Sequence, residues 1–558
     1  MTKQLLKLFA PYKRSPVTED YDVIVIGSGI GGLATAALLA KHGGKKVLVL
    51  ERHYMVGGFT HVFHRPGYEW DVGVHYIGDV QPGTVLRAVF DEVSDANLEW
   101  ADMGEVYDKI IIGDEEYAFP KGKKNLIAFL KTRFPGEESA IDQYFALVKQ
   151  ALSTSLAYHA EKALPNAMAM LAGPFLRRKF LAFSDRTTRE VLESLTKNQR
   201  LIAVLAGQFG DYGLPPAESS FMIHCMVANH YFEGGYYPLG GSERIAETMI
   251  PLIQAAGGKV LINADVAEVV VEKGRAVGVR MAADDKILRA PAIVSNAGVA
   301  NTFGKLIPSA VAERHGLPKK LRTLRPSASH LCLYIGLKHT AEELQLPKAN
   351  LWIYPDEHHE KNVNAAIADP TAPPPVVYVS FPAAKDPDFA NRHPGRATID
   401  VITIAPHEWF KKWEQEPWKK RGKEYEAFKE QLAQNLLKHL YKHVPQIEGK
   451  IDMYELGTPL STQHFCNYET GEIYGVDHTP QRFRQRFLRP RTPVKGLYLT
   501  GQDIVTCGVA GALFGGVLTA SSILGKNLVT GILKNARAGR VSSPAPAQNE
   551  HNAAKETT

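Results

Sequence analysis

The chain has 558 residues, of which 45% are hydrophobic and 22% charged, a composition that is typical of globular proteins and excludes a disordered or fibrous chain. The 65 Lys and Arg residues stand against 59 Asp and Glu residues and form no basic tract, so we expect no nucleic-acid partner. The four cysteines are far apart and form no C-x-x-C pair. We therefore expect no disulfide framework, no bound metal and a reducing, cytoplasmic compartment.

The first predicted elements are a buried strand over 21–26, a glycine turn, a helix of small residues that ends near His42, and a second strand over 46–50. This order predicts a β-α-β unit at the start of the fold. The turn reads GSGIGG. Because it follows a strand and opens a helix, it has the context of a dinucleotide-binding G-x-G-x-x-G turn.

Each glycine of this turn has a predicted role. Gly27 permits the tight turn, Gly29 lets the backbone approach a pyrophosphate, and Gly32 lets the helix and strand pack closely. The N-terminus of the helix then offers free N–H groups and a partial positive charge to the diphosphate. The alternative interpretation is a glycine turn that holds no ligand.

The residues after the second strand extend this predicted cofactor site. Glu51 can accept a hydrogen bond from a ribose 2′-hydroxyl and repels a 2′-phosphate, which favours FAD or NAD over NADP. Arg52 follows Glu51 and is included in the predicted site. At Gly57 and Gly58 the backbone can run close along an extended cofactor.

The C-terminal part of the chain favours FAD over NAD. From Gly496 the sequence predicts a strand, then Asp503, and then a helix whose first residues include Gly508 and Val509. The N–H groups at this helix end can hold the electron-rich pyrimidine edge of an isoalloxazine. The Asp503 carboxylate can accept a hydrogen bond from a ribityl hydroxyl, and its alternative role is that of an N-cap without a ligand.

The same helix lies in an uncharged run over 504–525, which is long enough to raise the question of a membrane span. Five glycines and four Ser or Thr residues dilute its hydrophobicity. We therefore favour a buried, closely packed helix.

Between the two ends of the chain, periodicity predicts a helix-rich stretch over 126–229, a strand-turn-strand segment over 260–281 and a strand over 289–296. An amphipathic helix is expected over 425–443. The tail after Arg537 is poor in apolar residues, which predicts disorder.

In these motifs the chain resembles the flavoprotein family of carotenoid desaturases, carotenoid isomerases and retinol saturases, in collinear stretches between residues 21 and 525. The most specific of these stretches are DVGVHYIG, GDYGLPP and GGYYPLGGS. The resemblance implies noncovalently bound FAD, an apolar polyene or unsaturated lipid substrate, and a position for the Val266 backbone near the adenine. Many amine-oxidase relatives carry an arginine after the Gly-Gly pair, where it meets the diphosphate. This chain departs from them, because the residue at that position is Phe59.

The resemblance also implies an α/β fold, with a Rossmann-type FAD-binding domain of the amine-oxidase kind and an inserted α+β substrate domain. We expect the discontinuous FAD-binding domain over 20–95, 235–300 and 456–534. The substrate-binding and membrane-associating region is expected over 96–234 and 301–455, and the disordered tail over 535–558.

Candidate acid and base residues are His75 and Tyr76 in VGVHYIG, and Tyr474 in IYGVDH. Hydride transfer to a double bond requires a proton at the adjacent carbon, which a Tyr or His can move. The alternative for each is a hydrogen-bonded structural residue. Asp477 and His478 are further candidates in the second motif.

The segment over 164–183 predicts a basic amphipathic helix, with Leu176, Phe180 and Phe183 on one face beside Arg177, Arg178 and Lys179. Such a helix can lie in a membrane interface. Its alternative is a core helix with a solvated basic edge. We expect peripheral membrane association, because the resemblance implies substrates that are insoluble in water.

Three functions remain open at this point. The first is an FAD-dependent oxidoreductase that saturates carbon-carbon double bonds, and the second is a desaturase or cis-trans isomerase that uses the same FAD. The third is a non-catalytic, flavin-holding protein. No second nucleotide fingerprint follows a later strand, so electrons are expected to come from, or pass to, an external partner.

Overall fold

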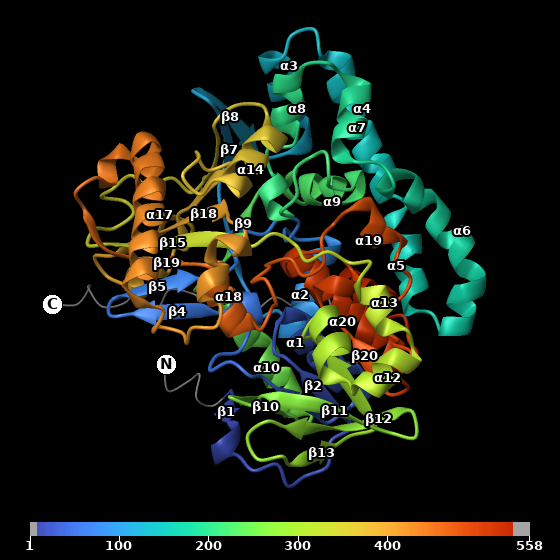
Figure 1. Ribbon diagram of the computed structural model, residues 1–558. Helices are drawn as coiled ribbons and strands as arrows, with labels where there is room; N and C mark the ends of the chain where they lie inside the picture. The colour runs from blue at the N-terminus through green and yellow to red at the C-terminus, as the bar shows by residue number, and fades with distance from the viewer. Residues whose placement is uncertain (1–7, 539–558) are drawn as a thin grey trace, which may run out of the picture.

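The computed structural model describes residues 8–538, and its first layer is a six-stranded parallel sheet. Figure 1 shows this sheet in the lower part of the molecule. Strand β2 alternates its side chains between two apolar layers, with Val23 and Val25 on one face and Ile24 and Ile26 on the other. Both faces are therefore covered, as expected for a parallel sheet. In spatial order the strands are β1 (Ala10–Pro11), β10 (Lys259–Ile262), β3 (Val47–Leu50), β2 (Val23–Ile26), β14 (Ala292–Ser295) and β20 (Leu497–Leu499).

Helices cover one face of this sheet and a small sheet covers the other. The predicted β-α-β unit is present as β2, α1 (Ile30–Gly43) and β3, with α1 packed beside α10 (Arg244–Ala255) and α20 (Gly508–Leu524). The predicted strand-turn-strand segment forms β11 (Val266–Glu272) and β12 (Arg275–Met281). Together with β13 (Ile287–Arg289), these strands make a three-stranded antiparallel sheet.

Glycines let α1 and α20 cross at very short range. A Cβ atom on Gly516 would lie 2.7 Å from the Ala34 Cβ and 2.9 Å from the Gly31 carbonyl oxygen. A Cβ on Gly31 would lie 2.5 Å from the Gly501 Cα. The predicted buried, closely packed helix is therefore confirmed, because most of α20 is buried at this crossing.

None of the helices in the described part of the chain is by itself long and apolar enough to cross a membrane. Helix α20 and the following α21 (Leu528–Arg537) reach the required length and hydropathy together, but the chain bends by 112° between them.

A seven-stranded mixed sheet forms the second layer, and the two segments over 96–234 and 301–455 both contribute to it. Strand β7 (Val106–Ile112) pairs in parallel with β16 (Asn350–Tyr354), which joins the two segments. The amphipathic helix predicted over 425–443 is α17 (Gly422–His443), and its buried leucines pack on this sheet. The other strands are β8 (Glu115–Pro120), β15 (His330–Leu337), β17 (Val377–Ser380), β18 (Ala397–Ile404) and β19 (Ile451–Gly457).

The predicted helix-rich stretch forms a lobe at the upper right of Figure 1. Its buried aromatic and aliphatic side chains make one continuous core with β7 and β8. The helices are α3 (Lys123–Arg133), α4 (Glu138–Leu152), α5 (Ser155–Ala163), α6 (Asn166–Ser184), α7 (Thr188–Leu195), α8 (Gln199–Leu205) and α9 (Phe221–Tyr231).

Helix α6 is present, but the prediction that its face with Leu176, Phe180 and Phe183 meets a membrane is wrong. The Phe180 ring is fully buried and stacks on Tyr158, with 3.7 Å between ring centroids. The Arg177 guanidinium is also buried, and it donates to the Phe483 carbonyl. These partners come from α5 and from residues far along the chain, so the helical pattern of α6 alone does not reveal which face they cover.

The C-terminal boundary also needs a correction. Helix α21 continues to Arg537 and packs on α2 (Val85–Ser94) and α20, so the predicted tail does not begin at 535. The remainder of that tail, 539–558, lies outside the described residues.

Replacing Gly516 with Ala should lower the free energy of unfolding by about 1–3 kcal/mol, because the added methyl group overpacks the α1–α20 crossing. The measurement is urea unfolding followed by circular dichroism. Gly531→Ala in α21 is the matched control, since its Cβ would meet no atom within 4 Å, and it should stabilise by about 0.5–1 kcal/mol. Equal behaviour of the two variants would contradict tight packing at the crossing.

Candidate active site

A large cavity lies between the parallel sheet and the mixed sheet. It is lined by residues from the glycine turn, from the ends of β3, β14 and β20, and from strands of the mixed sheet. All of the predicted FAD-binding residues line it except Gly32. These lining residues are Gly27, Gly29, Glu51, Arg52, Gly57, Gly58, Val266, Asp503, Gly508 and Val509.

The glycine turn has the geometry that its sequence predicts. Gly27 has a φ of 92°, which favours glycine, and Gly29 is the N-cap of α1. A Cβ on Gly32 would lie 2.2 Å from the Gly27 carbonyl oxygen. Gly32 therefore acts by packing under the turn rather than by facing the cavity.

The Glu51 carboxylate fastens this turn to the end of β3. It accepts hydrogen bonds from the Ser28 amide at 2.8 Å, the Ser28 hydroxyl at 2.7 Å and the His53 amide at 2.7 Å. The Ser28 hydroxyl in turn accepts from the Gly57 amide at 3.1 Å. A carboxylate offers about four acceptor positions, so Glu51 retains capacity for a ribose hydroxyl.

At the other end of the site, the Asp503 carboxylate accepts from the Val476 amide at 3.0 Å and from the Val299 amide at 2.7 Å. It does not cap α20, whose N-cap is Cys507. Gly508 opens the helix with a φ of 77°. The first amides of α20 therefore face the same cavity as the N-terminus of α1.

Asn296, at the end of β14, is a site residue that the sequence analysis missed. Cβ atoms on Gly29, Gly31 and Gly501 would lie 2.7, 2.9 and 2.4 Å from its side-chain amide. Asn296 thus fills the space that these three glycines leave beside the cavity. The SNAG sequence after a strand is the signal that could have indicated it.

The residues present fit an FAD molecule. Two helix N-termini open on one cavity, and glycines leave the backbone bare at both ends. Arg52 donates to the carbonyls of His464 and Phe465, and Phe59 lies near Tyr468. A bound diphosphate would therefore rely mainly on the N-terminus of α1, which is what the sequence predicts.

Beyond the start of α20, the cavity becomes apolar and aromatic. Trp352 and Tyr378 line this part from adjacent strands of the mixed sheet, with Val376, Ile402 and Ile404 beside them. Such a wall can hold a long hydrocarbon but offers little to a charged substrate.

The candidate acid and base residues take different positions. His75 lines the cavity, and burial lowers the pKa of its imidazole to about 4. Tyr474 also lines the cavity, and its hydroxyl donates to the Gly210 carbonyl at 3.0 Å. Tyr76 is buried behind the cavity wall, where its hydroxyl contacts Asp108 and Asp211.

The two further candidates have structural partners away from the cavity wall. The Asp477 carboxylate is paired with the Arg325 guanidinium. The His478 Nε2 accepts a hydrogen bond from the Cys507 amide at 2.9 Å, so it supports the loop that leads into α20.

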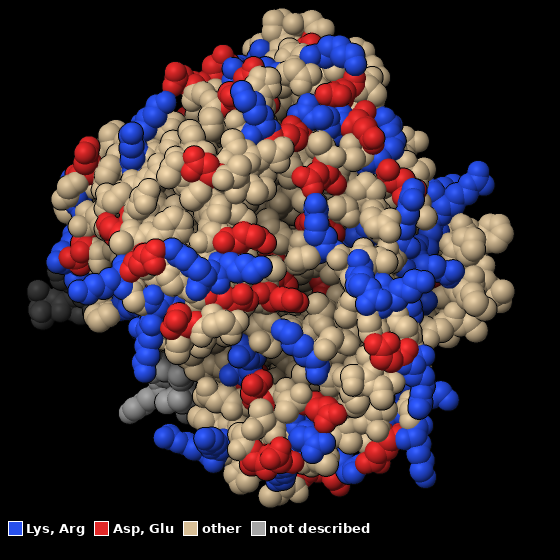
Figure 2. Space-filling model, in the orientation of Figure 1, with Lys and Arg blue, Asp and Glu red and all other residues tan. Residues whose placement is uncertain are grey.

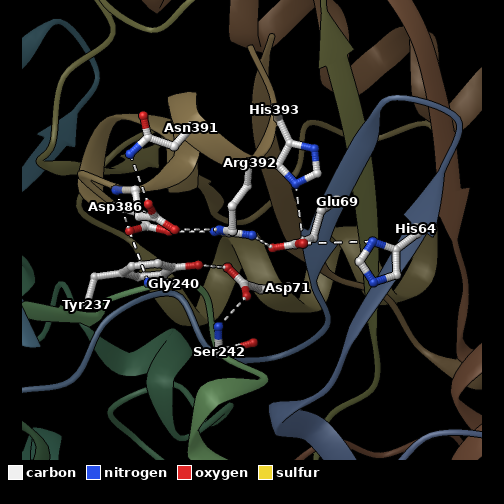
Figure 3. Close-up of polar contacts among 11 residues, drawn as sticks. His64, Glu69, Asp71, Tyr237, Gly240, Ser242, Asp386, Asn391, Arg392 and His393 are labelled. Atoms are coloured by element: carbon white, nitrogen blue, oxygen red, sulfur yellow. Dashed lines mark hydrogen bonds and ion pairs between the residues drawn. The ribbon is translucent and has the colours of Figure 1, made fainter. Parts of the chain in front are cut away.

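Figure 3 shows a polar cluster formed by residues that do not line the cavity. The Arg392 guanidinium contacts the carboxylates of Glu69 and Asp386, and Asp71 accepts from Tyr237. His64, Glu69 and Glu243 place potential metal ligands within 4.8 Å of one another. Arg392 already supplies a cation to Glu69, so the cluster is explained as an ion-pair network.

The chain is similar to known flavoproteins. The sequence pattern of the flavin containing amine oxidoreductases matches residues 30–524. The chain is 39% identical to the all-trans-retinol 13,14-reductase of Danio rerio, over 92% of this chain and 88% of that protein. It is 27% identical to the chloroplastic prolycopene isomerase of Arabidopsis thaliana, over 92% and 84% of the two chains.

Solved structures have the same fold at lower identity. A putrescine oxidase bound to putrescine superposes with a TM-score of 0.59 and 16% sequence identity, over 91% of this chain and 100% of that chain. At this identity the match establishes the amine-oxidase fold, with its Rossmann-type sheet, and it confirms the predicted fold class.

Replacing Glu51 with Ala should weaken FAD binding by roughly 1–3 kcal/mol, because a charge-assisted hydrogen bond to the ribose is lost. Isothermal titration of the apoprotein with FAD measures the change. Ser28→Ala is the matched control, since it removes the link between Glu51 and Gly57 but keeps the carboxylate. Equal losses in both variants would show that Glu51 only holds the turn.

Proposed function

The chain belongs to the family of flavin-containing amine oxidoreductases, and on that premise we propose that it saturates a carbon-carbon double bond of an apolar polyene or unsaturated lipid. It is an FAD-dependent oxidoreductase. The observation that carries the proposal is the single cavity in which a glycine-lined cofactor end continues into an aromatic, apolar end.

The residues that would hold FAD divide into two groups. Gly29, Glu51 and Val266 surround the part of the cavity for the adenosine and diphosphate, and Asp503 and Gly508 surround the part for the flavin. When bound and reduced, FAD supplies a hydride to one carbon of the double bond. The chain itself must orient the substrate, exclude water and deliver a proton to the neighbouring carbon.

We propose that the flavin is held noncovalently. Cys507 stands directly before α20 but does not line the cavity, and its Sγ contacts the Asp211 carbonyl. Burial raises the pKa of the Cys507 thiol to about 12, so the reactive thiolate is scarce. Cys466 lines the cavity beside Glu51, away from the predicted flavin end.

The substrate class is proposed from the apolar end of the cavity and from the similar proteins. Trp352, Tyr378 and Ile402 present rings and methyl groups without a cation that would bind a carboxylate. The similarity to retinol 13,14-reductases supports a retinoid or related polyene. We also propose an external electron donor, because no second nucleotide-binding fingerprint follows a later strand.

A desaturase or cis-trans isomerase is the second candidate function, and the similarity to prolycopene isomerases supports it. The same FAD and the same apolar wall serve either reaction. A non-catalytic, flavin-holding protein is less well supported, because the apolar part of the cavity extends beyond the residues that a flavin needs.

We also propose a membrane-facing patch, on a different face of α6 from the one predicted by sequence. Five of the nine exposed large apolar side chains among the described residues lie in α5 and α6. Figure 2 shows this uncharged protrusion at the right edge of the molecule, beside a group of basic side chains. The apolar patch consists of Leu156, Met168, Met170, Leu171 and Phe175.

Replacing Met168, Leu171 and Phe175 together with Ser should weaken binding to anionic phospholipid vesicles by roughly 10²-fold or more, since each buried side chain contributes about 1.5–3 kcal/mol. Vesicle sedimentation measures the effect. The control replaces Val85, Ile287 and Ile367, which are exposed elsewhere, and should bind like the parent protein. FAD absorbance should be unchanged in both variants. Vesicle binding by the patch variant equal to that of the parent protein would refute the patch.

Enzyme reduced with dithionite under nitrogen should convert a polyene, tested with retinoids, carotenoids and unsaturated fatty acids, to a product that carries two more hydrogens. Product mass and flavin absorbance are recorded together. A product of unchanged mass and altered geometry would establish isomerisation instead. A product with two fewer hydrogens, formed by the oxidised enzyme, would establish desaturation, and no product from any substrate would support the flavin-holding alternative.

A further inference from the structure

A tyrosine hydroxyl joins two carboxyl groups in the wall behind the apolar end of the cavity. The Tyr76 oxygen lies 2.9 Å from an Asp108 oxygen and 3.1 Å from an Asp211 oxygen. A tyrosine hydroxyl has one hydrogen and can donate it to only one acceptor. The second short contact therefore requires a proton on one of the two carboxyl groups.

Hydrogen-bond partners decide which carboxyl group carries this proton. Asp108 accepts from the Gln208 amide at 2.7 Å and from the Asn350 amide at 2.9 Å, in addition to Tyr76. Three donated hydrogen bonds favour the charged carboxylate. Among the described residues, Tyr76 is the sole side-chain partner found for the Asp211 carboxyl group.

The orientation of the Asn350 amide is fixed by a buried lysine. The Lys385 ammonium can only donate, and it donates to the Asn350 Oδ1, the Ser380 hydroxyl and the His75 carbonyl. The nitrogen of Asn350 must therefore point to Asp108. This chain of contacts keeps Asp108 as the acceptor and leaves the proton on Asp211.

Burial and charge act in the same direction. Burial and the neighbouring Asp108 carboxylate raise the pKa of Asp211 well above its ordinary value, whereas the pKa of Asp108 is raised to about 6. At neutral pH the structure thus holds a carboxylic acid at Asp211 and a carboxylate at Asp108.

Asp211 also occupies the right place for chemistry on a bound substrate. It lines the cavity together with Gly210, His75 and Tyr474. Its backbone carbonyl lies 3.6 Å from the Sγ of Cys507, the N-cap of α20. Asp211 therefore stands beside the start of α20, where the cofactor part of the cavity meets the apolar part.

We propose that Asp211 is the catalytic acid that gives a proton to the substrate, and that Tyr76 is the positioning residue that holds it. The inference rests on the proposed saturation. As the hydride from the reduced cofactor forms a C–H bond at one carbon, the electron pair of the double bond moves to the neighbouring carbon. That carbon takes the proton as the Asp211 O–H bond breaks, and the carboxylate left behind is reprotonated from water.

The other candidates are less suited to this role. His75 is neutral at physiological pH because burial lowers its pKa to about 4, so it has no readily released imidazolium proton. The Tyr474 hydroxyl already donates to Gly210, and burial raises its pKa well above the ordinary value. Tyr76 itself does not line the cavity.

The first arm of the test is infrared spectroscopy of the FAD-bound protein at neutral pH, without substrate. The carbonyl absorption of a protonated carboxylic acid should be present in the parent protein, shift in D₂O and decrease in Asp211→Asn. Asp79→Asn is the matched control for this loss. The Asp79 pKa is raised to about 6 and its φ is 58°, a conformation that Asn tolerates. An unchanged signal in Asp211→Asn would overturn the assignment of the proton.

The second arm follows reoxidation of the reduced enzyme by a polyene that the parent protein saturates. Asp211→Asn should bind FAD and the polyene normally but react roughly 10²–10⁴-fold more slowly, and Asp79→Asn should react like the parent. Full activity in Asp211→Asn would overturn the inference. So would a loss of rate of roughly 10²–10⁴-fold in Tyr474→Phe that Asp211→Asn does not show. A parent protein that saturates no polyene would instead refute the proposed function.

The pH profile tests the positioning role of Tyr76. Activity should fall as pH rises through the Asp211 pKa, because the acid must be protonated. Tyr76→Phe removes the oxygen that accepts the Asp211 O–H, a hydrogen bond that favours the protonated acid, so the fall should move to lower pH, whereas an unmoved profile would contradict the role. The titratable groups that act on or near this carboxyl are Asp108, Tyr76, Tyr212, Tyr231, Tyr354, Tyr378, Tyr474, Lys385 and Cys507.

Discussion

The close crossing of α1 and α20 is the contact on which the geometry of the site depends. Each helix begins at the cavity, and the bare backbones of Gly31 and Gly516 set how near the two helix ends lie. A cofactor that spans both ends would require this spacing, since the helix ends proposed to hold its two halves lie more than 450 positions apart in the sequence. The crossing therefore brings two local glycine turns to one cavity.

A second constraint lies behind the apolar end, where buried carboxyl groups outnumber cations. Lys385 faces Asp71, Asp108 and Asp400, and burial lowers its pKa to about 7. Burying several charges together is unfavourable unless they are neutralised or hydrogen-bonded. A hydrocarbon substrate gains no binding energy from such a wall. The polar network is accordingly better explained by proton transfer than by substrate recognition.

The cofactor end could be predicted from sequence because its signals are local. Gly27, Glu51 and Gly508 each lie next to the strand or helix that positions them. Asn296 and Asp211 acquire their roles only through contacts with distant segments. The SNAG stretch after a strand could have indicated Asn296, whereas no spacing in the sequence indicates Asp211. Helix α6 shows the same limit, because both of its faces carry apolar residues and the burial of Phe180 depends on Tyr158.

Two of the three motifs that gave the most specific resemblance also meet in space. DVGVHYIG supplies His75 and Tyr76, and GDYGLPP supplies Asp211, and the short Tyr76–Asp211 contact joins the two. The glycine turn is common to many dinucleotide-binding proteins, because it contacts only the diphosphate that these cofactors share. The two rarer motifs instead build part of the wall at the apolar end of the cavity. The Tyr76–Asp211 contact therefore brings the proposed acid and its positioning residue together from two segments that are far apart in the sequence.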